Sequence, residues 1–235
     1  MIYATSDIHG QFQKLRALLK KVNFGDEDFL FVLGDVIDRN GAGGVDMLRW
    51  MMTQPNVSLI LGNHEAMLLG CLFLLDPITQ ESLDRLTAEQ MDLASLWMDN
   101  GAEPTLRALK EWLYEEPEAR EALVDYLRDA PLFETVTAGG QDYLLVHSGL
   151  ENFAPQKKLS KYTADELLWH RPHPDQRYFD EVYTVLGHTP TELYGEGHKG
   201  RAFVTDTWMN IDTGAAAPDG APMLLRLDDR QAFYL

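Results

Sequence analysis

Three short apolar segments near the start of the chain each run directly into a motif of acidic, histidine and glycine residues. The segments Met1–Ser6, Phe29–Leu33 and Val57–Leu61 have the length and apolar character of strands. Between them, Gln11–Val22 has the apolar spacing of an amphipathic helix, and a second helix is expected near Gly44–Met52. Alternating strands and helices predict an α/β fold in which ligand sites gather at the carboxyl ends of the strands. The three motifs are therefore expected to meet at one edge of a sheet.

Two single histidines follow these motifs far downstream, and together they offer enough oxygen and nitrogen ligands for two divalent metal ions. The motifs and histidines are Asp7-Ile8-His9-Gly10, Gly34-Asp35-Val36-Ile37-Asp38-Arg39, Gly62-Asn63-His64-Glu65, His147 and His188. A carboxylate bridges two ions well, which makes Asp35 the candidate to link them at a separation of about 3.5–4 Å. Mixed oxygen and nitrogen ligation favours manganese, iron or zinc over calcium or magnesium. Such a pair of ions can generate a hydroxide nucleophile.

Three residues of these motifs are not needed as ligands. His64 directly follows a candidate ligand, so it can protonate a leaving alkoxide as general acid. Asp38 can hold that imidazole in one tautomer and support its charged form. Arg39 presents a planar set of donors to phosphate oxygens. The combination predicts metal-assisted phosphoester hydrolysis.

The three strings resemble the signature of the PPP phosphoprotein phosphatases, Asp-x-His-Gly, Gly-Asp-x-x-Asp-Arg and Gly-Asn-His-Glu. The resemblance extends from Met1 to Ala215, and its last three strings are most similar to the compact bacterial and phage branch of the family. The further matching strings are Val146-His147-Ser148-Gly149, Leu168-Trp169-His170-Arg171, Gly187-His188-Thr189-Pro190 and Asn210-Ile211-Asp212-Thr213-Gly214-Ala215.

The resemblance implies a calcineurin-like metallophosphoesterase fold, a mixed β-sandwich flanked by helices on both faces. It also implies two metal ions, with manganese expected and iron or zinc as alternatives. It assigns Asp7, His9 and Asp35 to the first ion and Asp35, Asn63, His147 and His188 to the second. Asp38 and His64 become the acid pair, and Arg39, Arg171 and Asn63 contact the phosphate.

One position departs from the family pattern. Asn40 stands where the family has glycine. Asparagine tolerates left-handed backbone better than most residues, so the turn is expected to persist.

Structural explanations compete with these assignments. Asp and Gly are ordinary turn formers. His147 could be a buried histidine that closes the apolar strand Tyr143–Val146, and His188 could be a turn residue. Arg171 could stack on Trp169 or cover a helix. The ordered set of motifs favours the functional assignment over each of these.

The main functional expectation is a serine/threonine protein phosphatase that hydrolyses phosphomonoesters. The alternative within the same family is a symmetrical dinucleoside tetraphosphate hydrolase. That branch resembles Gly-Asp-x-x-Ala-Arg and Gly-Asn-His-Asp, whereas Asp38 and Glu65 match the protein phosphatase pattern. A catalytically silent metal-binding module is a third possibility. It would be expected to lack a ligand or the acid, and neither is missing.

Composition bounds the partners and the compartment. The formal net charge is −17 over 235 residues, which argues against nucleic acid because phosphate backbones are bound by basic patches. A phosphorylated protein or a small phosphoester is the expected partner, and local positive charge has to come from metals and arginines. The apolar run Met67–Leu75 is too short to cross a membrane, and the start of the chain has no charged leader. The single cysteine, Cys71, forms no internal disulfide, so a cytoplasmic location is expected.

The length predicts one domain over residues 1–235 with a helical insertion at about 76–130. Apolar side chains of the insertion, including Trp97 and Trp112, are expected to pack against the core. Thr87-Ala88-Glu89-Gln90 has the form of a capping box. A helix is expected over Glu65–Leu75. Seven strands are expected in the last part of the chain, at Phe133–Thr137, Tyr143–His147, Val182–Leu186, Ala202–Thr205, Met209–Asp212, Met223–Leu227 and Ala232–Leu235.

Overall fold

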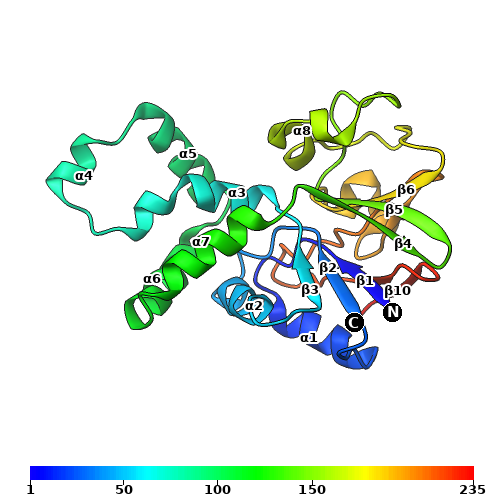
Figure 1. The fold of residues 1–235 in the computed structure, drawn as a ribbon, viewed down its shortest axis with the longest axis horizontal. Helices are drawn as coiled ribbons and strands as arrows, with labels where there is room; N and C mark the ends of the chain where they lie inside the picture. The colour runs from blue at the N-terminus through cyan, green and yellow to red at the C-terminus, as the bar shows by residue number, and fades with distance from the viewer.

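The computed structural model describes residues 1–235 and contains two mixed sheets that face each other, with helices on their outer sides (Figure 1). The first sheet is formed by β1 (Ile2–Thr5), β2 (Phe29–Val32), β3 (Val57–Leu59), β9 (Leu224–Arg226) and β10 (Gln231–Phe233). Its strand order is β10-β9-β1-β2-β3. The strands β1, β2 and β3 are parallel, and β9 and β10 add an antiparallel edge. The carboxyl ends of the three parallel strands therefore lie at one edge, as the strand and motif pattern predicts.

The second sheet also has five strands, in the order β4-β5-β6-β8-β7. Its strands are β4 (Phe133–Ala138), β5 (Gln141–Val146), β6 (Val182–Leu186), β7 (Phe203–Val204) and β8 (Trp208–Asn210). Here β5, β6 and β8 run parallel, and the antiparallel strands β4 and β7 close the two edges. The predicted strands are present, and each of their ends lies within two residues of the predicted position. The prediction that Asp212 lies within a strand is wrong, because β8 ends at Asn210.

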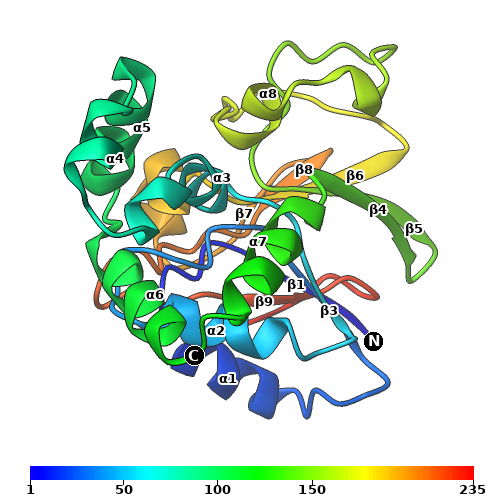
Figure 2. The same cartoon turned by 60° about the vertical axis from the view of Figure 1, so that its left-hand side comes forward.

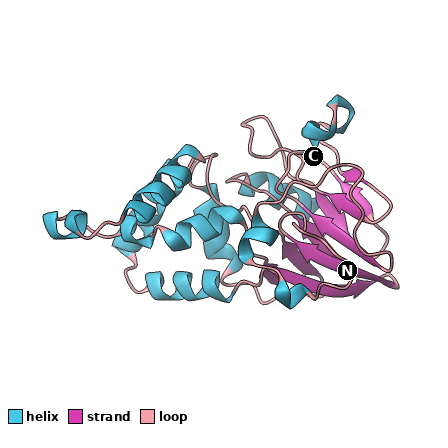
Figure 3. Cartoon of the chain, turned by 90° about the horizontal axis from the view of Figure 1, so that it is seen from above, coloured by secondary structure: helices cyan, strands magenta, loops and turns pink.

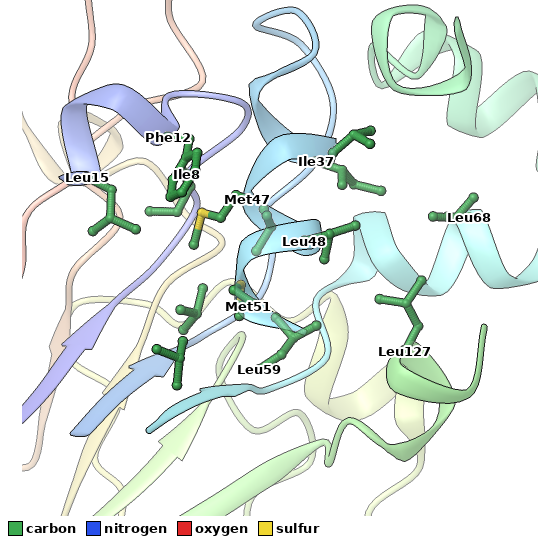
Figure 4. Packing of buried hydrophobic residues seen from close by; sticks show 14 of the residues in the cluster. Ile8, Phe12, Leu15, Ile37, Met47, Leu48, Met51, Leu59, Leu68 and Leu127 are labelled. Atoms are coloured by element: carbon green, nitrogen blue, oxygen red, sulfur yellow. The ribbon is translucent and has the colours of Figure 1, made fainter. Parts of the chain in front are cut away.

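The core is divided by the sheets. Side chains from both sheets, including Phe31, Leu145 and Leu225, fill the space between them. Helices α1 (Phe12–Lys21) and α2 (Gly43–Met51) cover the outer face of the first sheet. Figure 4 shows this packing, in which Leu15 and Leu48 lie among the buried side chains. On the outer face of the second sheet, α8 (Ala164–Leu168) contributes Leu167 to a smaller apolar cluster.

The other helices gather at one end of the molecule (Figure 3). They are α3 (Asn63–Gly70), α4 (Gln80–Asp84), α5 (Ala88–Asp99), α6 (Glu103–Glu115) and α7 (Ala119–Asp129). Helices α5 and α7 pack on α3, and α6 packs on α2, so the stretch from α5 to α7 is joined to the first sheet through two helices (Figure 2). The buried indoles of Trp97 and Trp112 belong to the same core as α1 and α2, which confirms their predicted packing. The capping box at Thr87 and Gln90 is also present.

The expected helix over Glu65–Leu75 is wrong in both bounds. Helix α3 begins at Asn63 and ends at Gly70, and a separate 3₁₀ turn follows over Leu72–Leu75. The earlier start follows from the Glu65 carboxylate, which accepts the N–H of Gly62 at the helix entrance. Short 3₁₀ helices cover Leu159–Lys161, Thr191–Tyr194 and Glu196–His198. None of the helices has the length and apolar character to span a membrane.

Candidate active site

The three N-terminal motifs occupy the loops that follow β1, β2 and β3, and they meet the downstream histidines at the edge of the sandwich. The backbone of Asp7 donates to Gly34 O, and that of His9 donates to Asp35 O, so the first two loops are bonded to each other. A Cβ at Gly62 would collide with the backbone and carboxylate of Asp35, which explains why glycine precedes Asn63. The loops therefore approach closely enough for their side chains to share ligands.

The carboxylate of Asp35 lies between two histidines from different parts of the fold. Its Oδ2 is 3.6 Å from His9 Nε2, and its Oδ1 is 3.4 Å from His147 Nε2. The side chain is almost fully buried. Each oxygen of one carboxylate thus faces a separate nitrogen ligand, which is the arrangement that a bridging ligand requires.

His9 and His147 are oriented by contacts between their Nδ1 atoms and backbone carbonyl oxygens. His9 Nδ1 lies 2.9 Å from Ile37 O, and His147 Nδ1 lies 2.7 Å from Leu33 O. A ring that donates Nδ1–H to a backbone carbonyl leaves the Nε2 lone pair free, as is usual for metal-binding histidines. Burial, aided by the nearby His64 and Arg39, lowers the pKa of His9 well below its usual value, so this ring is neutral.

Asn63 and His188 complete the group around His147. Asn63 Oδ1 lies 2.9 Å from His147 Nε2 and 3.0 Å from His188 Nδ1. Burial also lowers the pKa of His188, with His147 and Arg171 adding to the effect. The ligand atoms of Asp35, His147 and His188 all lie within 4.8 Å of one another, and those of Asp35, His9 and His64 form a second such group.

Two further buried carboxylates explain why this cluster suits cations. Asp7 Oδ2 accepts hydrogen bonds from Ser6 Oγ and from the backbone N–H of His188. Burial, with Asp212 and Asp35 nearby, raises the pKa of Asp7 well above its usual value. Burial likewise raises the pKa of Asp35, and that of Asp212 to about 6. Ionised carboxylates are costly to bury unless they are paired or coordinate metals. The donors present therefore fit divalent cations.

His64 lies beside this cluster and is held from behind by Asp38. His64 Nδ1 is 2.5 Å from Asp38 Oδ2, and the two side chains are buried. His64 Nε2 is 3.8 Å from Asp35 Oδ2 and 3.4 Å from Arg39 Nη2. Burial raises the pKa of Asp38 to about 6 and lowers that of His64. By distance alone, His64 could be a metal ligand. It differs from His9 and His147 because its Nδ1 contacts a carboxylate, that of Asp38, whereas theirs contact backbone carbonyls.

The candidate ligands border a cavity of about 290 Å³. Arg39 and Arg171 are exposed side chains on its lining, and Trp169 and Asn100 also line it. These two arginines place positive charge at the mouth of a cavity whose floor is acidic. All ten residues that the sequence marks as site residues lie in or directly behind this cavity.

Three residues that contribute to the candidate site were not among the predicted site residues. The carboxylate of Glu65 accepts the backbone N–H groups of Asp35, Val36 and Ile37 at 2.8, 2.9 and 3.3 Å, so it holds the loop that carries the central ligand. Asp212 lines the cavity, and its only signal was its place in a matching string. Trp97, from α5, contacts Asp38 through its indole N–H.

Asn40 differs from the expectation for the turn. The turn persists, but left-handed backbone is found at Asp38, Arg39 and Gly41, not at Asn40. Its side-chain amide instead lies within hydrogen-bond distance of His9 O, Ala215 O and Ala216 O, at 2.9, 3.0 and 3.1 Å. Asn40 therefore joins the first motif loop to the loop after β8.

Comparisons with known proteins bear on the family and the fold of the chain. The sequence profile of the calcineurin-like phosphoesterase family matches residues 1–215. A symmetrical bis(5'-nucleosyl)-tetraphosphatase of Acidovorax sp. (strain JS42) is 26% identical over 186 residues, which is 79% of this chain and 51% of that protein. A protein of the same name from Salmonella paratyphi B is 43% identical over 70 residues, 29% of this chain and 24% of the relative. The chain spans about half of the length of the first of these relatives.

Solved structures share the fold over the whole chain. A protein provisionally assigned as a diadenosine tetraphosphatase has a TM-score of 0.65 at 17% identity, with 100% of this chain and 92% of that chain covered. A serine/threonine phosphatase from Saccharomyces cerevisiae has a TM-score of 0.57 at 15% identity, with 100% and 79% covered. At these identities the likeness concerns the fold alone. The family profile covers most of the chain, and the chain belongs to the calcineurin-like phosphoesterase family.

Proposed function

We propose that this chain is a phosphohydrolase that uses two divalent metal ions, with manganese as the first ion to supply. The observation that carries the proposal is the position of Asp35, whose two carboxylate oxygens face His9 and His147 separately. The first ion would be held by Asp7, His9 and Asp35, and the second by Asp35, Asn63, His147 and His188. The buried carboxylates support this assignment because burial raises the pKa of both Asp7 and Asp35, and ionised carboxylates are costly to bury unless they are paired or coordinate metals.

Two ions, when bound, would stabilise charge on the phosphoryl group and activate a water molecule. The protein's own side chains would bind the phosphate and protonate the leaving group. Arg39 and Arg171 would bind phosphate oxygens through their guanidinium groups, with Asn63 beside them. His64 would protonate the leaving oxygen through Nε2, while Asp38 holds Nδ1. We also propose that the whole chain forms one domain and that residues 76–130 are an insertion in it.

The curated relatives support a dinucleoside tetraphosphate better than a phosphoprotein as substrate. Each is named as a symmetrical bis(5'-nucleosyl)-tetraphosphatase. This reverses the order of the two expectations from the sequence, and diadenosine tetraphosphate becomes the first substrate to test. Because the first of these relatives is about twice as long as the matched segment, its activity comes to this chain only as a proposal.

A specific contact keeps phosphomonoesters as the second candidate. The Asp38–His64 pair, at 2.5 Å, suits the protonation of an alkoxide. Serine and threonine oxygens are poor leaving groups that need this proton, whereas a nucleoside diphosphate leaves more easily. The pair would therefore matter most for phosphoserine or phosphothreonine.

A direct comparison of kcat/KM separates the two candidates. The manganese-loaded chain is assayed with diadenosine tetraphosphate, phosphoserine and phosphothreonine peptides, and 4-nitrophenyl phosphate. A higher kcat/KM on the dinucleotide supports the first candidate, and a higher value on the peptides supports the second. Asp38→Ala adds a second criterion, since it should reduce the peptide reaction more than the nitrophenyl reaction. If the folded, metal-loaded parent chain hydrolyses none of these substrates, the proposed reaction itself is contradicted.

A further inference from the structure

The turn that carries Asp38 and Arg39 has an unusual backbone. Both residues have φ of 72°, in the left-handed region that disfavours side chains. Asp38 is fully buried and Arg39 is exposed on the cavity, so the turn presents one residue to His64 and the other to the phosphate site. A conformation of this kind persists only where surrounding contacts maintain it.

Those contacts come from the corner between α5 and α6, about 60 residues further along the chain. The N–H of Asp38 donates to Thr105 Oγ1 at 2.8 Å, and the N–H of Arg39 donates to Gly101 O at 2.9 Å. Trp97 Nε1 donates to Asp38 Oδ2 at 2.8 Å. Trp97 and Thr105 are both buried, so water does not compete for these bonds.

The indole reaches the same oxygen that faces the acid. Asp38 Oδ2 lies between Trp97 Nε1 and His64 Nδ1, whereas Asp38 Oδ1 has no hydrogen-bond partner. Besides the imidazole itself, Trp97 is therefore the side-chain partner that fixes the rotation of this carboxylate. Loss of its N–H would remove this restraint and leave the Asp38 carboxylate free to rotate out of the orientation that faces His64.

We propose that the α5–α6 corner is a clamp that positions the acid pair and the phosphate arginine, with Trp97 and Thr105 as positioning residues for the reaction. Trp97 sets the Asp38 carboxylate, and through it the orientation of His64. Thr105 and Gly101 hold the backbone of the turn that also carries Arg39. The clamp rests on the proposed phosphohydrolase function, and it makes the helical segment part of the active site as well as a cover for the core.

The test compares two indoles of the same helical segment. Trp97→Phe keeps the ring in the core and removes the N–H. Trp112→Phe makes the same change at a buried indole that donates to Glu116 at 3.1 Å and not to the site. Hydrogen bonds to charged groups are strong enough that Trp97→Phe should lower kcat on an alkyl phosphate such as phosphoserine by about 10-fold. On 4-nitrophenyl phosphate the loss should be within about 2-fold, because that leaving group needs little protonation.

Trp112→Phe should leave both rates unchanged. An equal loss on both esters with Trp97→Phe, or no loss on either, would overturn the role of Trp97. Thr105→Val keeps the side-chain shape and removes the oxygen that accepts the N–H of Asp38. This variant should lower kcat on phosphoserine, and it should raise KM because Arg39 moves with the turn. Thr105→Ser retains the hydroxyl and should restore both parameters. Thr105→Val kinetics equal to those of the parent chain would overturn the role of Thr105.

A measurement on the metal-free chain keeps the clamp separate from the proposed function. Among the five tryptophans, the indole N–H resonance of Trp97 is the one that disappears in Trp97→Phe. Its exchange with solvent should be slow, and it should become at least about 10-fold faster in Asp38→Ala but not in Glu116→Ala. Equal exchange in the parent chain and Asp38→Ala would overturn the clamp even if hydrolysis is observed. Slow exchange without any hydrolysis would contradict the proposed function and leave the clamp supported.

Discussion

Replacement of Glu65 by glutamine tests how the loop that carries Asp35 is held. The Glu65 carboxylate is fully buried and accepts four backbone N–H groups. Oε2 accepts from Asp35 and Gly62, and Oε1 accepts from Val36 and Ile37. In either orientation, a glutamine amide would therefore turn its NH₂ group toward two backbone donors that have no other partner.

The loss of stability in Glu65→Gln can be worked out from the two hydrogen bonds that are lost. Hydrogen bonds to a charged acceptor contribute about 1.5–3 kcal/mol each, so the lower limit gives a loss of about 3 kcal/mol in the free energy of unfolding. For a chain of this size, 1 kcal/mol shifts Tm by about 2–4 °C, which gives a fall of about 6–12 °C. Urea unfolding followed by circular dichroism should show the lower midpoint with an unchanged slope.

Glu81→Gln is the matched control. Glu81 is 73% exposed and pairs only with Arg85, so its replacement should change the unfolding free energy by less than about 0.5 kcal/mol. If Glu65→Gln unfolds at the same urea concentration as the parent chain, the carboxylate does not hold the loop and the reasoning from its four acceptors fails.

Three further predictions concern the metals, the acid and the free thiol. Asp35→Asn should weaken metal binding at both positions, and metal analysis after dialysis against manganese should find two ions per parent chain; one ion or none would contradict the bridging role. His64→Asn should lower kcat on phosphoserine peptides by roughly 10²–10⁴-fold with metal content retained, and by less on 4-nitrophenyl phosphate; equal losses on both would remove His64 from the acid role. Cys71 is fully buried, and burial raises the pKa of its thiol to about 11, so a thiol reagent at pH 8 should label it only in urea; full labelling of the native chain would contradict its burial.

Much of the site could be predicted because its parts are local in sequence. Asp7, Asp35 and Asn63 each follow a short apolar strand, and parallel strands bring their carboxyl ends to one edge whatever the rest of the chain does. The seven strands of the second half were also predicted, since short runs of mainly apolar residues mark them. Their order in the sheet was not predicted, because pairing depends on contacts between distant segments.

The parts that could not be predicted depend on single polar atoms at long range. The indole of Trp97 fits the apolar pattern of α5, and nothing in that pattern says that its N–H reaches Asp38, 59 residues away. The side-chain amide of Asn40 bonds to carbonyls about 175 residues further along the chain. The role of Glu65 depends on how two loops, after β2 and after β3, pack around one buried carboxylate. Such contacts have no periodicity, so hydrophobic patterns do not reveal them.

The backbone of the site has a consequence for how this protein can adapt to heat. Six of the nine non-glycine residues with left-handed backbone belong to the candidate site, namely Asp7, His9, Asp35, Asp38, Arg39 and His188. Each such residue costs on the order of 1 kcal/mol, so together they use up stability comparable with the net stability of a typical domain. Glycine at any of these positions would relax the chain while removing a functional group. Selection for thermal resistance and selection for turnover therefore oppose each other at these six positions, and heat-adapted variants should gain their stability elsewhere in the sandwich.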